Sequence, residues 1–114
     1  MIVKLNGKTI KTPHSWEVER YRISKAERVA SGNMVMDTIA LKRKFLVGYT
    51  ELSGRDLDAI LDIIYTNDEF INLGYEENGK MKSAVVYCGP IRAKKYRTNM
   101  GWYWVDVSFN LIER

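Results

Sequence analysis

The stretch Ser53-Gly-Arg-Asp-Leu-Asp-Ala-Ile-Leu-Asp-Ile-Ile-Tyr65 decides how the rest of the chain is read. Its apolar side chains recur at the i, i+3, i+4, i+7 spacing that places them in one stripe of an α-helix: Leu57, Ile60, Leu61 and Ile64. Ser53 is well placed as the N-cap, because its hydroxyl can accept a hydrogen bond from a first-turn N–H, and Asp56 resembles the acid of a capping box. The turn-forming cluster at 66–68 ends the pattern. We therefore predict one amphipathic helix over about residues 53–65.

The segments around this helix have the patterns of β-strands. Asn-Gly pairs at 6–7 and 78–79 predict two tight hairpin turns, and residues 37–52 are the longest strand candidate. The final strand alternates, and we expect it to bury its odd positions, Tyr103, Val105, Val107, Phe109 and Leu111. A sheet with one helix needs that helix to cover an apolar face. We predict a mainly β (α+β) fold, an antiparallel β-sandwich or partly closed barrel packed against a single helix.

The length and composition indicate one soluble domain over residues 1–114. Hydrophobic residues make up 46% and charged residues 28% of the chain, which excludes the composition of a disordered protein. No run approaches the roughly 18 apolar residues of a membrane span, and the N-terminus lacks the apolar core of a signal peptide. The single cysteine, Cys88, cannot form an internal disulfide. We expect synthesis in a reducing cytoplasm and no membrane partner.

Residues 24–36 have neither a period of two nor a helical stripe, and Ser31-Gly32-Asn33 is a turn cluster in their middle. We expect a long connecting loop there. One interpretation is a solvated connection, and the other is a functional loop, because connections of this length are uncommon in a compact domain. The end of the segment is more apolar than a solvated connection needs.

No catalytic or metal-ligating constellation stands out in the sequence. His14 has the setting of a turn residue, and Cys88 lies in an apolar strand as a packed thiol. One histidine and one cysteine cannot supply a zinc site, and the helix acids Asp56, Asp58 and Asp62 lack the loop pattern of a calcium site. The glycines are isolated turn residues without a phosphate-binding loop. We predict a protein with no enzymatic role and no cofactor.

Two regions carry side chains that suit a protein–protein interface. One is the predicted loop, and the other is the start of the final strand, where two tryptophans fall on a face that becomes polar further along. Aromatic residues, methionine and arginine are enriched at interface cores. The candidate residues for contacts between subunits are Arg28, Val29, Met34, Val35, Met36, Trp102 and Trp104.

A basic segment at 91–98 favours an alternative. Its basic side chains and its tyrosine lie close in sequence to Trp102 and Trp104, as in a stacking platform beside a basic groove. The residues that would contact nucleic acid are Arg92, Lys94, Lys95, Tyr96 and Arg97. Mixed aromatic and basic residues are also common in β proteins, and the net charge of +4 permits nucleic acid without requiring it. The alternative function is that of a small β-barrel nucleic-acid-binding protein.

The order of these elements resembles the tail-tube fold of long-tailed bacteriophages, which the N-terminal domain of distal tail proteins shares. Locally, Arg28-Val-Ala-Ser-Gly-Asn-Met-Val-Met-Asp37 followed by Ala40-Leu-Lys-Arg-Lys-Phe45 is similar to a stretch of small prophage tail proteins of Gram-positive bacteria. In those proteins a Ser-Gly or Ala-Gly turn and an Asp precede a basic strand, and a Leu-Ser step, here Leu52-Ser53, enters the helix. The ending from Tyr103 to Glu113 resembles their closing strand.

This resemblance implies a non-enzymatic structural subunit of a virion tail, made in the host bacterial cytoplasm. Such proteins form rings, commonly hexameric, in which the sheets of neighbours join into a continuous barrel and a long loop reaches the adjacent ring. Residues 24–36 would be that loop, and the partners would be copies of the chain itself and other phage tail proteins. A main tube protein usually has an acidic lumen, whereas this chain is net basic. The resemblance therefore fits a baseplate, completion or connector position as well as the tube.

Overall fold

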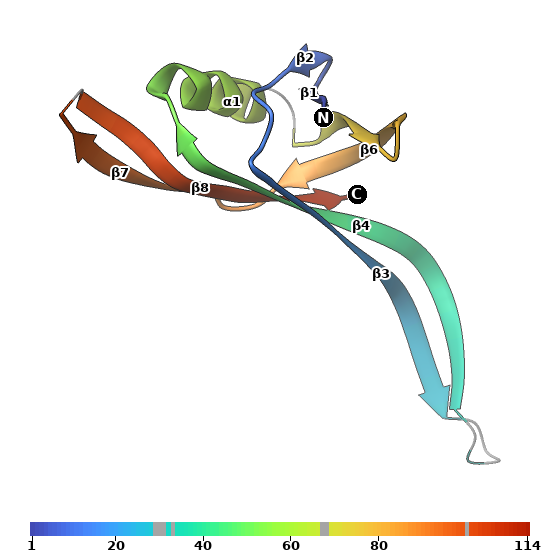
Figure 1. The fold of residues 1–114 in the computed structure, drawn as a ribbon. Helices are drawn as coiled ribbons and strands as arrows, with labels where there is room; N and C mark the ends of the chain where they lie inside the picture. Colours follow the sequence, from blue (N-terminus) through green and yellow to red (C-terminus); the bar gives the residue numbers. More distant parts are fainter. Residues whose placement is uncertain (29–31, 33, 67–68, 100) are drawn as a thin grey trace.

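The computed structural model describes residues 1–28, 32, 34–66, 69–99 and 101–114, and it is mainly β with one helix (Figure 1). In chain order the elements are β1 (Val3–Leu5), β2 (Lys8–Thr9), β3 (Ser15–Arg28), β4 (Met34–Leu52), α1 (Gly54–Thr66), β5 (Ile71–Glu77), β6 (Lys80–Cys88), β7 (Arg92–Thr98) and β8 (Gly101–Glu113). All strand pairs among the described residues are antiparallel. One sheet runs in the order β2-β1-β5-β6-β8-β4-β3, with β7 added on β8, and it is not closed into a barrel over the described residues. The predicted mainly β fold with a single packed helix is confirmed.

Both Asn-Gly pairs form the predicted tight turns. Asn6 and Gly7 have φ values of 51° and 80°, and Asn78 and Gly79 have 54° and 76°. Positive φ at both central residues is the requirement of the two-residue hairpin turn whose twist matches that of the strands. The second turn joins β5 to β6 in a register that places Ile71 opposite Val86.

Helix α1 begins at the predicted cap. The Asp56 N–H donates to Ser53 Oγ at 3.3 Å, and the Ser53 hydroxyl donates to Asp56 Oδ2 at 3.0 Å. The buried side chains of the helix are Leu57, Ile60, Ile63 and Ile64, whereas Leu61 is only half-buried. The buried arc is therefore rotated from the predicted stripe, away from Leu61 and toward Ile63.

The core lies inside the curl of the sheet. Phe45 on β4 and Tyr75 on β5 have ring centroids 4.9 Å apart, although β8 and β6 separate their strands in the sheet. Trp16 on β3 lies 5.7 Å from the same Tyr75 ring. The two ends of the sheet therefore fold toward each other over one apolar layer. In Figure 1, α1 and the β1–β2 hairpin lie on one side of the long strands β8, β4 and β3.

Strand β8 changes the face that it buries partway along its length. Val107, Phe109 and Leu111 are buried as predicted, but Tyr103 and Val105 are only half-buried, and Trp104 packs against the core. Asp106 has a φ of 51°, and the β7–β8 register shifts between Arg92 and Lys94, as at a β-bulge. Because a bulge inserts one residue, the alternation changes phase across it. The prediction that all odd positions of this strand are buried was therefore wrong for its first half.

The predicted loop at 24–36 is corrected to a strand hairpin. Strand β3 continues to Arg28 and β4 begins at Met34, with Arg28 opposite Met34 and Ala26 opposite Met36. In the described chain β4 pairs with β8 from Lys44 to Leu52, so the β3–β4 ladder continues past the rest of the sheet, and the sequence of this part shows no period of two. A register shift between Ile23 and Ser24 interrupts the ladder further.

We call residues 22–28 and 34–41 of this hairpin the arm. It projects from the body and makes the molecule 69 × 29 × 27 Å (Figure 1). The radius of gyration is 18.1 Å, against about 13 Å for a compact domain of this length. The arm therefore lies outside the compact body.

Leu57→Ala is expected to lower the free energy of unfolding by about 2–5 kcal/mol, because the loss of a buried leucine leaves a cavity. Leu61→Ala removes the same atoms from a half-buried position, so we expect a loss of about 1 kcal/mol or less. Chemical denaturation of the two variants and the unaltered protein measures both values. Equal losses would contradict the rotated position of the helix.

Candidate assembly surfaces

The face of β3 and β4 that lines the core continues into the arm. Antiparallel partners share a face, and alternate residues along each strand return to it. Val18 and Phe45 are partners on this face, and Phe45 is fully buried. Further out, Arg22 and Leu41 are partners on the same face, where Leu41 is 69% exposed. The apolar lining of the core therefore runs outward to a leucine that the body leaves uncovered.

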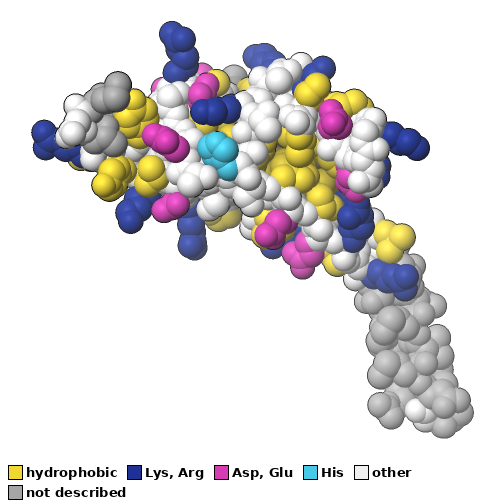
Figure 2. All heavy atoms as spheres, viewed as in Figure 1, with side chains coloured by type: hydrophobic (Ala, Val, Ile, Leu, Met, Phe, Trp, Pro, Cys, Tyr) yellow, Lys and Arg dark blue, Asp and Glu magenta, His cyan; other side chains and the backbone are white. Residues whose placement is uncertain are grey.

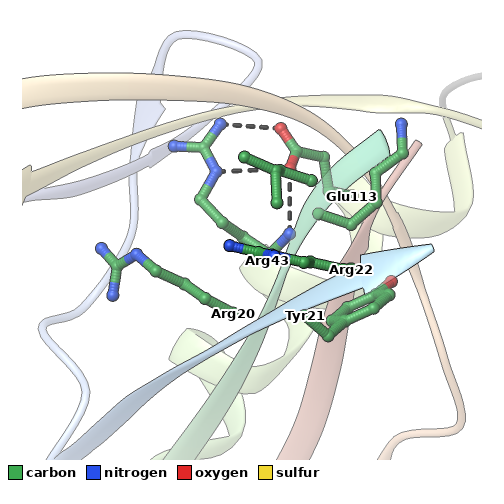
Figure 3. A pocket seen from close by; sticks show the side chains of 7 residues that line it. Arg20, Tyr21, Arg22, Arg43 and Glu113 are labelled. Carbon is green, nitrogen blue, oxygen red and sulfur yellow. Dashed lines mark hydrogen bonds and ion pairs between the residues drawn. The ribbon is translucent and has the colours of Figure 1, made fainter. Parts of the chain in front are cut away.

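Arg43 closes the core at the point where the arm begins. It lies between Leu41 and Phe45 on the shared face, and its guanidinium forms two contacts with Glu113 of β8 (Figure 3). The Nε–Oε1 distance is 3.3 Å and the Nη2–Oε2 distance is 2.7 Å, while the backbone N–H of Arg43 donates to Oε1 at 2.9 Å. The guanidinium also donates to the Tyr75 hydroxyl at 2.6 Å and to the Ser83 carbonyl at 3.1 Å. One side chain thus joins β4 to β5, β6 and β8.

These contacts change the protonation of both partners. The hydrogen bond from Arg43 outweighs the opposing effect of burial and lowers the pKa of Glu113. The hydrogen bond to Glu113 raises the pKa of Arg43. The two side chains are 19% and 25% exposed, so water screens the pair less than it screens a fully exposed one. A second pair at the same end joins Arg20 of β3 to Glu77 of β5.

A hollow of about 480 Å³ lies at the base of the arm. Figure 3 shows Arg20, Tyr21 and Arg22 on β3 approaching it, with the Arg43–Glu113 pair above them. The residues that line it are Arg20, Tyr21, Arg22, Leu41, Lys42, Arg43 and Glu113. Four of these seven are basic, and Glu113 is the one acid among them. The hollow therefore combines an exposed apolar side chain with positive charge, a combination suited to contact with another protein. The sequence did not single it out, because its basic residues lie on separate strands.

The predicted interface residues occupy two separate places. Arg28, Met34, Val35 and Met36 belong to the ladder of the outer arm, whereas Val29 lies outside the described residues. The two tryptophans lie at the other end of the molecule, on β8. Trp102 is 58% exposed as expected, but Trp104 packs partly against the core, so it is not on a fully wet face. The bulge at Asp106 accounts for this difference.

The β7–β8 hairpin brings together the residues of the nucleic-acid alternative. Lys95 lies opposite Trp104 and Arg97 opposite Trp102, so these four side chains share one face. The Lys95 ammonium lies 5.4 Å from the Trp102 ring and 5.5 Å from the Trp104 ring, within cation–π range. Arg92, Lys94 and Tyr96 are exposed on the other face. The basic residues are thus divided between two faces of the hairpin.

Charge elsewhere on the surface is mixed. Figure 2 shows Lys and Arg side chains around the rim of the body, interspersed with Asp and Glu. His14 Nδ1 accepts a hydrogen bond from the Thr50 N–H at 2.9 Å, and burial raises the pKa of the Cys88 thiol to about 11. Cys88 is therefore a protonated thiol at neutral pH, as a packed cysteine would be.

Among the described residues, no group of three or more His, Cys, Asp and Glu side chains is placed to hold a metal ion. Helix α1 has 13 residues, and no helix among the described residues is long and apolar enough to cross a membrane.

Comparison of the chain with models of protein families, with curated proteins and with solved structures found no match. The kinship with phage tail proteins therefore stays a prediction from the sequence.

The Arg43–Glu113 pair is expected to make stability fall in acid. Because the folded-state pKa of Glu113 is lowered, its carboxylate stabilises the fold above the ordinary Glu pKa of about 4.3. This contribution is lost as the pH falls through the folded-state pKa. Glu113→Gln should lower the free energy of unfolding at neutral pH by about 1–3 kcal/mol, since hydrogen bonds to a charged group are weakened.

Urea denaturation between neutral pH and about pH 3 tests this expectation. The difference between the unaltered protein and Glu113→Gln should shrink as the pH falls through this range. Glu51→Gln, at an exposed position of β4, is the control and should have little effect at any pH. A difference for Glu113→Gln that stays constant down to about pH 3 would contradict the role of the ion pair.

Proposed function

We propose that this chain is a non-enzymatic structural subunit of a bacteriophage (prophage) tail, which assembles with copies of itself into a ring. The observation that carries the proposal is the arm. The Lys42 ammonium donates to the Arg114 carbonyl, and beyond this contact the backbones of the two strands pair with each other. Two strands alone are at best marginally stable in water. An arm of this kind gains its packing from a neighbouring molecule.

The base of the arm supports the same role. Leu41 is 69% exposed there and lines the basic hollow. Apolar side chains next to arginines are typical of the centre of an interface. A neighbour that covers the hollow would bury Leu41 and would continue the core of the body outward.

The open sheet supports assembly as well. Within the described chain β3 pairs only with β4, and β7 pairs only with β8, so each has a free edge. Free edges are a hazard to a monomer, because they can pair with any other strand. In a closed ring each edge is covered by the next subunit.

The proposed location is the virion tail, with synthesis in the host bacterial cytoplasm. The partners are copies of this chain, in a ring that the resemblance suggests is hexameric, and other tail proteins. The net charge of +4 favours a distal tail, baseplate, completion or connector position over the lining of a DNA conduit. Genes for tape-measure or major tail proteins beside its own gene are the expected genomic setting.

A variant with a shortened arm tests this function. In this variant an Asn-Gly turn replaces residues 24–39. The turn connects Ile23 to Ala40, which are partners in the ladder. The body should keep its thermal midpoint within a few degrees, because the core lies elsewhere, but the variant should lose assembly. Light scattering and negative-stain imaging over a range of concentrations measure assembly of both proteins. Closed rings or tubes from the full chain are the expected result, and equal assembly of the shortened variant would contradict the role of the arm.

A second candidate function is binding of single-stranded nucleic acid by the β7–β8 hairpin. It is favoured by one observation, namely that Lys95, Arg97, Trp102 and Trp104 share a face. Bases stack on exposed aromatic rings while nearby cations contact the phosphates. The partial burial of Trp104 leaves mainly Trp102 for stacking, which makes this the weaker proposal.

Titration with a single-stranded oligonucleotide tests the second function. Phosphate contacts would give an affinity that falls with salt, with a log–log slope of several, because bound counterions are released. Trp102→Ala should then cost about 1–3 kcal/mol of binding free energy through lost stacking. Unchanged elution of the protein with added oligonucleotide would exclude this function.

A further inference from the structure

We propose that, in the ring, strand β3 of one copy pairs antiparallel with strand β7 of the next copy. In this register Glu17 lies opposite Lys94 and Glu19 opposite Arg92. The inference rests on the proposed assembly function and names the contact that would build it. The partner of each free edge is therefore a strand from another copy of this chain.

The directions of the strands allow this pairing. Strands β7, β8, β4 and β3 are neighbours in this order, and each pair is antiparallel. Strands β3 and β7, at the two ends of this set, therefore run in opposite directions. When subunits repeat around an axis in the same orientation, β3 of one copy meets β7 of the next with antiparallel polarity. The alternation of strand direction therefore continues across the junction between the two copies.

The charges on the two free edges are complementary. Glu17 and Glu19 are exposed on one face of β3, and Arg92 and Lys94 are exposed on one face of β7. No ion pair joins any of these four side chains to another described residue. Opposite charges directly across two strands stabilise the pairing, and like charges destabilise it. The proposed register forms two such opposite pairs.

The other face of the two strands agrees with this register. It places Val18 opposite Ala93, and both are half-buried against the core of their own subunit. A parallel pairing that matched the same four charges would instead set Arg20 opposite Lys95 and Arg22 opposite Arg97. Two like-charge pairs make that arrangement unfavourable. The side chains of both faces therefore favour the antiparallel register.

The proposed register also sets the offset between neighbouring subunits. Within one copy, Arg92, Ser108, Gly48 and Ser15 lie in one row across the four strands. In the proposed junction Arg92 of the next copy lies opposite Glu19, four residues further along β3 than Ser15. Four residues of about 3.4 Å, over four strands spaced about 4.8 Å, correspond to a strand tilt of about 35°. Closed barrels have strand tilts of about 35–45°.

Charge reversal on each edge tests the junction. The variant E17K/E19K has two basic edges, and R92E/K94E has two acidic edges, so each alone should lose ring formation by light scattering. In an equal mixture each reversed edge meets a complementary one, and rings of alternating variants should form again. The control D58K/D62K carries the same charge change as the first variant on exposed helix positions and should assemble as the unaltered protein does.

The outcomes separate this junction from the assembly function itself. Thermal melting should show that both variants remain folded, since all four positions are exposed. Rings restored by mixing support the junction. If the unaltered protein forms rings and each reversed variant alone also forms them, the junction is overturned. If the unaltered protein forms rings but the mixture of folded variants does not, the junction is likewise overturned. The assembly function stands in both cases. An unaltered protein that stays monomeric at every concentration overturns the assembly function and the junction with it.

Discussion

The contact between Phe45 and Tyr75 is the constraint on which the rest of the fold depends. The two rings join strands that are three places apart in the sheet, at a centroid distance of 4.9 Å and an interplanar angle of 61°. Edge-to-face contacts of this kind are stabilising beyond the area that they bury. Without this contact the sheet would be an open ribbon with one wet apolar face. With it, the sheet curls enough for one short helix to cover the remaining opening.

Arg43 sets the boundary between this curled body and the arm. Its guanidinium carbon lies 5.8 Å from the Phe45 ring centroid and 5.9 Å from that of Tyr75, so the cation covers the end of the aromatic cluster. Its hydrogen bonds to Glu113, Tyr75 and Ser83 compensate for the partial loss of water. An apolar side chain at this position would extend the core into the hairpin. The charged side chain of Arg43 ends the core there, and β3 and β4 continue beyond it as a two-stranded hairpin.

The sequence predicted the features that local chemistry determines. Ser53, the two Asn-Gly turns and most of the helix stripe follow from hydrogen bonds and φ values within a few residues. The arm was mistaken for a loop because residues 24–36 lack the period of two by which a strand is recognised in a sequence. The position of Trp104 was mistaken because one residue with positive φ, Asp106, changes the phase of the strand. The cluster around Arg43 joins four strands, and no single stretch of sequence contains it.

The separation of arm and body divides the selective pressures on this chain. Substitutions in the body act on folding first, since they alter a core shared by the helix and most of the strands. Substitutions in the outer arm leave that core intact, because its strands pair only with each other in the described chain. In the proposed assembly, the arm could therefore diverge to recognise new neighbours while the body keeps its stability. A lineage built on this fold would then change its assembly partners without first acquiring compensating mutations in the core.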